Sequence, residues 1–432
     1  MFKSINKIKI LQIFSFLSLF IYSTFFLGKY LGYFDTYWIF FSRDDQFADF
    51  HKLIYSFSHL FSNQDLISLS VPKSLSNPLL NPYSVVLENG ATPNMGHPPL
   101  TIILLISSAL ITKSAGLHYS LIYIFYIFAF GLFLFKFYYH KLRDNPFLIF
   151  ILLSYPLLFL VDRGNIWAAI SGCCLLVIFK SFVKNQELTY LDLIMFILAS
   201  SIRPNYLVFG LLFLSDVTVR STVRKLFKVG IYFVGANSLF LYISTTIFPG
   251  YNLGYFVYLV DRYAQSEIRF NAWNSSLHGF IYNVYSNISI SSNNPLPKDS
   301  TLRLEELIVG QAVNKLILII YFSILIISFI NFKLYRLDKI SFLTILCCFT
   351  AISTSPFGDY HLIIFIFLFF TVYEYSKNDK KSILQLTLIA IIILPKFHSI
   401  SPEINIHNVV NVLCLNGLLF ASYIKHKTNN LS

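Results

Sequence analysis

The chain has 432 residues, of which 56% are hydrophobic, 18% aromatic and only 12% charged, and its mean hydropathy is +0.64. Soluble domains carry about 25% charged residues, so this composition excludes a soluble globular protein and predicts an all-α, polytopic integral membrane protein. The net charge of +12 is spread over short clusters between apolar segments. This spacing is typical of topology signals and indicates no nucleic-acid partner.

The first apolar segment, residues 8–32, is preceded by Lys3 and Lys7 and contains Lys9 near its start. The apolar core of a signal peptide spans about 7–15 residues and ends at a small-residue cleavage site. This segment is longer and shows no such site. We therefore expect a retained membrane helix with a cytoplasmic N-terminus.

An acidic stretch follows within a long first loop, residues 33–118. It holds Asp44, Asp45 and Asp49, and acidic groups beside a membrane indicate a functional site because they are costly near hydrocarbon. Apolar residues repeat at spacings of three and four from Phe47 to Phe61, which predicts an amphipathic helix lying on the membrane surface. Asp45 and Asp49 then share one face of that helix.

The rest of the chain reads as membrane segments, many of them short. We expect about 12 spans in total, several of about 13–16 residues, where a straight span needs about 20. Short helices that meet at residues 163–165 and 203–205 predict broken segments around a water-filled cavity. The run 100–112 is expected to be re-entrant or juxtamembrane. The later spans are predicted at 119–136, 146–161, 165–182, 188–201, 204–216, 227–248, 312–331, 338–354, 360–375, 382–396 and 407–424.

Basic clusters assign sides, because Lys and Arg favour cytoplasmic loops. The clusters are Lys136/Lys141/Arg143, Lys180/Lys184, Arg220/Arg224/Lys225/Lys228, Lys333/Arg336/Lys339, Lys377/Lys380/Lys381 and Lys425/Lys427. If all are cytoplasmic, both termini are too, and every unusual polar motif falls on the outer face. We expect one integral membrane domain, residues 1–432, in the inner (cytoplasmic) membrane of a bacterium. Its long outer loops are 33–118 and 249–311.

The predicted outer face gathers the residues that could carry chemistry. They are the carboxylates Asp44, Asp45, Asp49, Asp162 and Asp359, the donors Arg163, Arg203, His97, His278 and His361, and the amides Asn165, Asn205 and Asn274. A carboxylate near cationic groups suits transfer of a sugar from a polyprenyl phosphate. One Asp serves as general base toward an acceptor hydroxyl, and Arg and His stabilise the departing phosphate.

Several of these residues also fit structural roles. Asp44 and Asp45 suit the start of a helix, where the dipole favours negative charge, and Asp49 could pair with Lys52 in solvent. Arg203 could cap carbonyl groups freed by the broken helix. Asp162 or lipid headgroups could hold Arg163, and interfacial hydrogen bonds could hold the histidines. The cysteines lie inside apolar runs and indicate packing. Asp44, Asp45 and His97 leave a divalent metal open, but no ligand spacing indicates one, so we predict no cofactor and no metal site.

The order of these features resembles the glycosyltransferase C superfamily, and most closely its polyprenol-phosphate-mannose-dependent alpha-mannosyltransferase branch. The matching pieces are Ala48-Asp49-Phe50-His51, Asn81-Pro82-Tyr83, Gly96-His97-Pro98-Pro99, Arg163-Gly164-Asn165, Arg203-Pro204-Asn205, Asn274-Ser275-Ser276-Leu277-His278-Gly279, Ser355-Pro356 and Asp359-Tyr360-His361. The resemblance implies a C-type glycosyltransferase fold with Asp49 as base and Asp45 in reserve. The chain has Arg163-Gly164-Asn165 where Gly-Gln-x-Asn is common, and Arg203-Pro204 where Lys-Pro is usual.

The sequence therefore predicts an inverting glycosyltransferase that moves mannose or another hexose from a polyprenyl-phosphate donor to a glycan or glycolipid acceptor, within membrane lipid. In this hypothesis Arg163, Arg203, His361, His97 and His278 bind the donor phosphate, and Asn165, Asn205 and Asn274 bind substrate. Two other classes stay open: a surface-polysaccharide (O-antigen type) polymerase or ligase, and a non-enzymatic transporter of lipid-linked saccharides. The acidic first loop favours the transferase, and a transporter would often show internal repeats that this sequence lacks.

Overall fold

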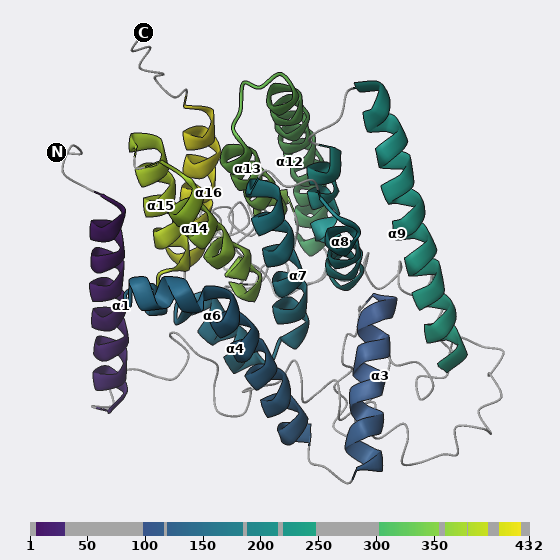
Figure 1. Cartoon of the computed structure of the whole chain (residues 1–432), viewed down its shortest axis with the longest axis horizontal. Coiled ribbons are helices and arrows are strands. Elements are labelled where there is room, and N and C mark those ends of the chain that lie inside the picture. The colour runs from purple at the N-terminus through teal and green to yellow at the C-terminus, as the bar shows by residue number, and fades with distance from the viewer. Residues whose placement is uncertain are drawn as a thin grey trace.

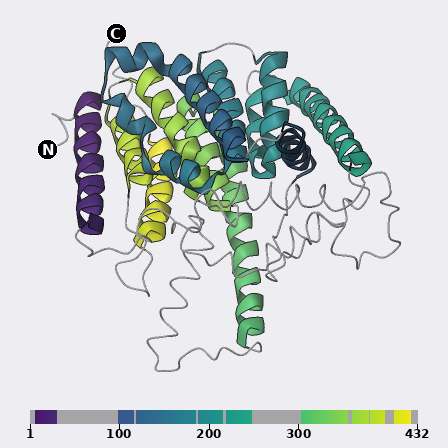
Figure 2. The same ribbon diagram turned by 90° about the horizontal axis from the view of Figure 1, so that it is seen from below.

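The computed structural model describes residues 6–30, 98–115, 119–184, 188–214, 219–247, 302–353, 359–377, 379–395 and 406–424. Every regular element in these ranges is a helix and none is a strand, which confirms the predicted all-α class. Figures 1 and 2 show the helices gathered into a bundle, with α12 projecting beyond the others in the second view. In chain order the α-helices and the 3₁₀-helices (η) are α1 (Lys7–Tyr30), α3 (Pro99–Ser114), α4 (Tyr119–Asp144), α5 (Leu148–Leu152), α6 (Tyr155–Arg163), α7 (Ile166–Val183), α8 (Tyr190–Ile202), η5 (Pro204–Leu214), α9 (Val219–Ile247), α12 (Leu302–Lys333), α13 (Lys339–Ser353), η7 (Asp359–Leu362), α14 (Ile363–Tyr375), α15 (Lys380–Ile393) and α16 (Ile406–Tyr423).

Four helical stretches of the described chain are long and apolar enough to cross a membrane. They are Lys7–Thr24 in α1, Leu121–Asp144 in α4, Ile166–Val183 in α7 and Arg224–Thr246 in α9. Other apolar stretches have 10–17 residues, including Ile363–Tyr375. The four long helices support a membrane protein, and the count of about 12 spans stays a prediction.

The centre of the bundle is α14, which is apolar on all sides. Its residues from Ile363 to Val372 are all buried, and it packs against α7, α13 and α15. A helix that is hydrophobic all round must be covered by neighbours. α7 comes close to α14 at Gly172, where an added Cβ would lie 2.9 Å from the ring of Phe367.

Helices at the edge of the bundle turn large apolar side chains outward. Phe125 and Phe128 of α4 are 67% and 63% exposed, and Phe227 and Val234 of α9 are 69% and 62% exposed. Figure 1 shows α9 along one edge of the bundle. Contiguous exposed apolar surface of this kind marks a membrane or protein contact and is rare on soluble monomers.

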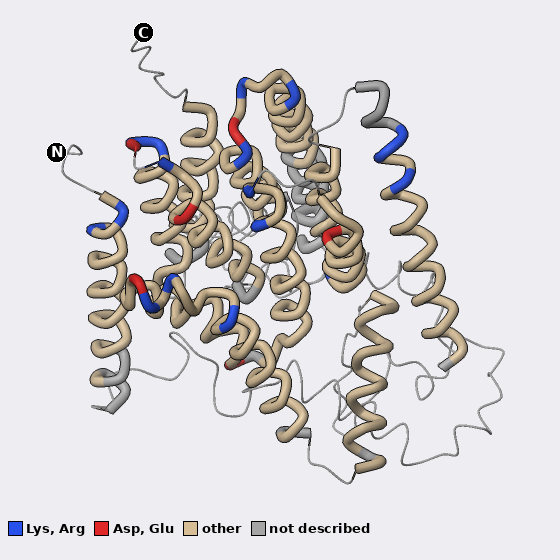
Figure 3. The backbone as a smooth tube through the Cα atoms, viewed as in Figure 1, with Lys and Arg blue, Asp and Glu red and all other residues tan. Residues whose placement is uncertain are grey.

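Basic side chains join several helix ends at one end of the bundle. Lys7 Nζ at the start of α1 donates to the carbonyl of Tyr373 at 2.9 Å, near the end of α14. Lys339 Nζ at the start of α13 donates to the carbonyl of Phe182 at 3.1 Å, near the end of α7. Figure 3 shows basic residues towards the upper ends of α1, α9, α12 and α15. Several of the predicted basic clusters in the described chain therefore lie towards one end, whose cytoplasmic placement stays a prediction.

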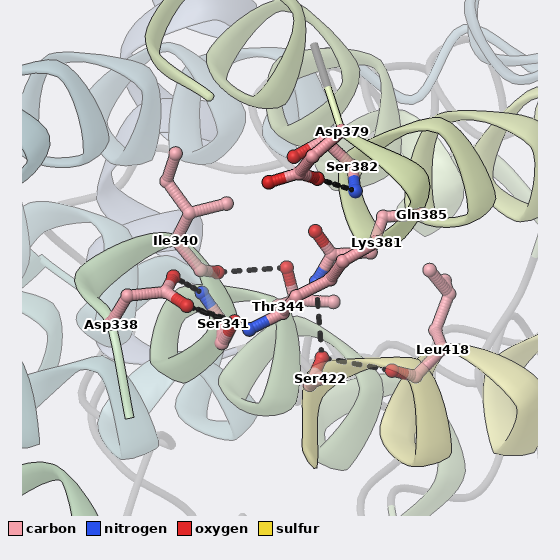
Figure 4. Close-up of polar contacts among 10 residues, drawn as sticks. All are labelled: Asp338, Ile340, Ser341, Thr344, Asp379, Lys381, Ser382, Gln385, Leu418 and Ser422. Carbon is pink, nitrogen blue, oxygen red and sulfur yellow. Dashed lines mark hydrogen bonds and ion pairs between the residues drawn. The ribbon is translucent and has the colours of Figure 1, made fainter. Parts of the chain in front are cut away.

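An ion pair between buried Lys381 and half-exposed Asp338 ties α15 to α13 at this same end (Figure 4). Lys381 Nζ lies 2.7 Å from Asp338 Oδ2, and the Lys381 side chain is only 9% exposed. The backbone N–H and the hydroxyl of Ser341 both donate to the Asp338 carboxylate at 2.8 Å. Gln385 Nε2 donates to Ser422 Oγ at 3.3 Å, which links α15 to α16.

The structure changes several of the expected helix boundaries, and α9 and α12 begin at Val219 and Leu302, before the spans predicted at 227–248 and 312–331. The span predicted at 146–161 is two helices, α5 and α6, because Ser154 takes the N-cap position of α6 and Pro156 lies in its first turn. The span predicted at 204–216 is the 3₁₀-helix η5. α4 continues past residue 136 to Asp144, since Lys and Arg are good helix formers. α3 closely matches the run expected at 100–112.

Candidate functional site

The junction between α6 and α7 breaks where Gly164 follows Arg163. Gly164 adopts a left-handed conformation with φ of 71°, which glycine adopts without steric cost, and it ends α6. Asn165 then takes the N-cap position of α7, and its side-chain oxygen accepts from the Ala168 N–H at 3.1 Å. Asn is among the preferred N-cap residues because it satisfies a backbone donor at the helix start. The predicted helix break is confirmed here.

α8 ends at Arg203 in the same region. Arg203 is extended, with φ −132° and ψ 94°, and Pro204 follows it. Proline disfavours a helical conformation for the preceding residue, so this sequence stops the α-helix. The chain continues as η5, whose Tyr206 N–H donates to the Arg203 carbonyl at 2.9 Å.

A side-chain hydrogen bond joins these two breaks. Arg203 Nη2 donates to Asn165 Oδ1 at 2.7 Å, and Asn165 is 5% exposed. Asn165 Oδ1 therefore accepts from both the α7 backbone and the guanidinium. Hydrogen bonds to a charged group contribute about 1.5–3 kcal/mol. This bond fixes the half-buried Arg203 head group at the meeting point of two helix ends.

His361 belongs to the same region. It lies on η7, which precedes α14 and packs against α6, and its side chain is 5% exposed. Burial lowers the pKa of His361 well below its usual value, and the nearby Arg203 guanidinium lowers it further. This shift favours the neutral imidazole, which carries one ring N–H. The positive charge of this region comes from Arg203 rather than from His361.

Two aromatic residues that sequence reasoning missed border the site. The Tyr123 hydroxyl of α4 donates to the carbonyl of Val161, which lies in the last turn of α6. Trp167, in the first turn of α7, is 1% exposed, and its ring N–H has no hydrogen-bond partner among the described residues. Trp167 lies only two residues after Asn165, and this position could have drawn attention to it in the sequence. A buried tryptophan usually finds a partner for its N–H.

The structure brings together three of the predicted residues: Asn165, Arg203 and His361. Asn205 lies half-buried on η5, and Arg163 ends α6, where only its backbone is described. The described chain holds no group of three or more His, Cys, Asp or Glu side chains that could bind a metal. Asp44, Asp45, Asp49, His97, Asn274 and His278 lie outside the described residues, as does the side chain of Asp359.

The arrangement can bind an anionic oxygen. The guanidinium carries charge and several donors in a fixed planar arrangement, and a neutral imidazole carries one ring N–H without a charge of its own. A phosphate oxygen matches this set, because arginine forms charge-assisted hydrogen bonds to phosphate. The site lies where four chain segments meet, at α6, α7, α8 and η7.

Comparison with protein-family models, with curated proteins and with solved structures found no match to this chain.

Proposed function

We propose that this chain is an inverting membrane glycosyltransferase that moves mannose or another hexose from a polyprenyl-phosphate donor to a glycan or glycolipid acceptor. The single observation that supports this most is the 2.7 Å hydrogen bond from Arg203 to Asn165 beside buried His361. It holds a cation at a break between helices, and the proposal requires a lipid phosphate to reach that cation from the bilayer. Short helices that end around a polar centre are typical of irregular backbone tolerated at membrane depth.

The proposed reaction has one step. The oxygen of an acceptor hydroxyl attacks the anomeric carbon of the donor sugar, and the bond from that carbon to the phosphate oxygen breaks. The hydroxyl proton passes to the carboxylate of Asp49, with Asp45 as the alternative base. The electron pair leaves on the polyprenyl phosphate, whose charge Arg203 stabilises. Attack opposite the leaving group inverts the anomeric configuration.

The proposal places the protein in the inner (cytoplasmic) membrane, with about 12 spans, both termini cytoplasmic and the site on the outer face. Two features of the fold support this orientation. Basic helix ends meet through Lys7, Lys141 and Lys339 at one end of the bundle. α7 runs from Asn165 of the site towards Lys180 at that basic end. Basic residues favour the cytoplasmic side, so Asn165 falls on the other side.

Three matched substitutions in the acidic loop test the proposed base. Asp49→Asn, Asp45→Asn and Asp44→Asn each remove one carboxylate at nearly constant size, and each is assayed for transfer of labelled sugar at equal membrane expression. We expect Asp49→Asn to lower the transfer rate by about 10²–10⁴-fold, the usual contribution of a general base, with Asp44→Asn near wild type. Loss of transfer activity in Asp45→Asn alone would assign the role of general base to Asp45. Full activity in all three variants would overturn the carboxylate mechanism.

A further inference from the structure

A second cluster of charged groups lies far from Arg203, where α4, α7 and α14 end. Its members are three lysines, Lys141, Lys180 and Lys184, and one carboxylate, Glu374, and we call it the lysine cluster. Lys180 is 15 residues after Asn165 on one continuous helix, which corresponds to roughly 20 Å along its axis. The lysine cluster is therefore separate from the site described above.

The charges of the lysine cluster do not balance. Lys141 Nζ lies 3.3 Å from Glu374 Oε1, so the only carboxylate of the cluster is already paired. Lys180 is half-buried, and its electrostatic neighbours are Lys184, Glu374 and Lys141. Neither Lys180 nor Lys184 forms an ion pair with any described residue. Among the described residues, the cluster therefore keeps two positive charges in excess.

Within the described part of the chain, nearby charged groups do not correct this imbalance. Lys7 Nζ donates hydrogen bonds to the carbonyls of Tyr373 and Ser376, at 2.9 and 2.5 Å. Arg143 and Asp144 pair with each other at 3.6 Å. The ammonium of Lys180 lies 4.1 Å from the centre of the Phe137 ring. A cation–π contact of this kind offsets only part of the cost of withdrawing the charge from water.

A buried hydroxyl adds a neutral donor to the same place. Tyr138 of α4 is 3% exposed, its ring stacks on Phe370 at a centroid distance of 3.9 Å, and its hydroxyl has no hydrogen-bond partner in the described chain. Glu374 and Tyr375 are among its electrostatic neighbours. An unmatched buried hydroxyl beside an excess of positive charge favours an anionic acceptor.

The side of α4 that faces outward indicates what carries that anion. Leu132, Phe135 and Tyr139 of α4 are 52%, 54% and 44% exposed, and they precede or adjoin Tyr138 along the helix. An apolar chain can lie along this surface while its head group reaches the lysine cluster. Basic clusters between membrane helices on the cytoplasmic side bind lipid head groups by this combination of charge and apolar contact.

We propose that Lys141, Lys180, Lys184 and Tyr138 form a binding site for the phosphate group of an anionic lipid, at the end of the bundle opposite Arg203. The ammonium groups of Lys180 and Lys184 contact the phosphate oxygens, and the Tyr138 hydroxyl donates to one of them. Lys141 stays paired with Glu374 and borders the site. This site is independent of the proposed transferase activity, since none of its residues contacts the Arg203 region.

The test uses the purified full-length protein in an uncharged detergent. Phosphatidic acid, phosphatidylcholine and inorganic phosphate are added in turn, and bound lipid is counted by native mass spectrometry alongside the thermal unfolding temperature. We expect phosphatidic acid to bind and to raise the unfolding temperature, with no comparable effect of the other two. Equal binding of phosphatidylcholine would overturn the proposal, and full competition by inorganic phosphate at equal concentration would assign the site to the free ion instead.

Two variants and a charge-matched control locate the binding. Lys180→Ala/Lys184→Ala should weaken phosphatidic acid binding by about tenfold or more, and Tyr138→Phe by a few-fold, since it removes only one hydrogen bond. Arg224→Ala/Lys225→Ala removes the same charge from exposed positions of α9 and should bind like wild type. Equal loss in this control would show a general effect of net charge and contradict the site.

Discussion

Two hydrogen bonds converge on one oxygen of Asn165, one from the backbone of α7 and one from Arg203. The residue therefore acts as an N-cap and as the acceptor that orients a guanidinium. An asparagine oxygen can accept both bonds without bringing a negative charge to the Arg203 guanidinium. An aspartate would accept the same bonds but would neutralise that charge.

Substitutions of Asn165 should separate stability from ligand binding. Asn165→Ala removes both bonds, and we expect it to lower the free energy of unfolding by about 1–3 kcal/mol. Asn165→Asp should keep the stability yet raise the KM for the lipid-phosphate donor, because a carboxylate competes with phosphate for Arg203. Thermal unfolding and donor titration measure the two effects.

Asn237→Ala is a suitable control for Asn165→Ala. Asn237 Nδ2 donates only to the Phe233 carbonyl of its own helix, at 2.9 Å, in α9. Its loss should cost well under 1 kcal/mol and leave the donor KM unchanged. A larger KM for Asn165→Ala than for Asn165→Asp would contradict the charge argument.

At the scale of elements, α7 packs closely against α14 because Gly172 has no side chain. Gly172→Ala places a methyl group 2.9 Å from the Phe367 ring, and the surroundings of Phe367 are fully packed. We expect a loss of about 1–3 kcal/mol in the free energy of unfolding, since overpacking strains a dense core. Gly131→Ala on α4 has no atom within 4 Å of the new Cβ and should be neutral or stabilising. Equal effects of the two changes, measured by thermal unfolding in detergent, would show that the close contact is unimportant.

The ion pair between α13 and α15 should make stability depend on acid pH. Burial works to raise the pKa of Asp338, but hydrogen bonding and attraction by Lys381, with the two bonds from Ser341, outweigh it and hold that pKa below its usual value. Its contribution is thus fully present above the unfolded pKa of about 3.9 and is lost as the pH falls through the lower folded value. Asp338 is 45% exposed, so solvent limits this contribution.

Asp338→Asn leaves the Lys381 ammonium buried without its carboxylate. We expect a cost of about 1–2 kcal/mol at pH 7, less than for a fully buried pair because Asp338 is half-exposed. The double variant Asp338→Asn/Lys381→Met removes the stranded charge and should recover most of that loss. Thermal unfolding from pH 7 to pH 3 should show a smaller acid-induced loss in both variants than in wild type, and an unchanged profile would contradict the assignment to Asp338.

At the scale of the whole molecule, the residues that end and begin helices made the helix breaks predictable. The contacts between helices could not be predicted from those residues. Gly164, Pro204 and the capping Asn165 are sequence signals for where helices stop and start, and the structure bears them out. The division of residues 146–161 into α5 and α6 was missed because the apolar residues on both sides of Ser154 and Pro156 were taken as one span. Hydropathy also gives no reliable span count where apolar helices have only 10–17 residues.

The sequence predicted only that Asn165 and Arg203 lie on the same side of the membrane, and it did not predict their contact. The two residues are 38 positions apart, and their contact depends on how α7 packs against α8. The same holds for Lys381, which the sequence placed in a basic cluster expected to be cytoplasmic and which the fold buries against Asp338. Charge patterns assign a residue to one end of a bundle, but packing decides its partner.

The central claim is that the chain breaks the bond between a sugar and a polyprenyl phosphate. The most direct measurement incubates the purified protein in liposomes with polyprenyl-phosphate sugars labelled in the sugar, together with glycan or glycolipid acceptors. Transferase activity predicts that label leaves the lipid and enters the acceptor with inverted anomeric configuration, in wild type but not in Asp49→Asn. Label that crosses the bilayer still attached to its lipid, or label that moves only as part of a preassembled saccharide chain, would contradict it.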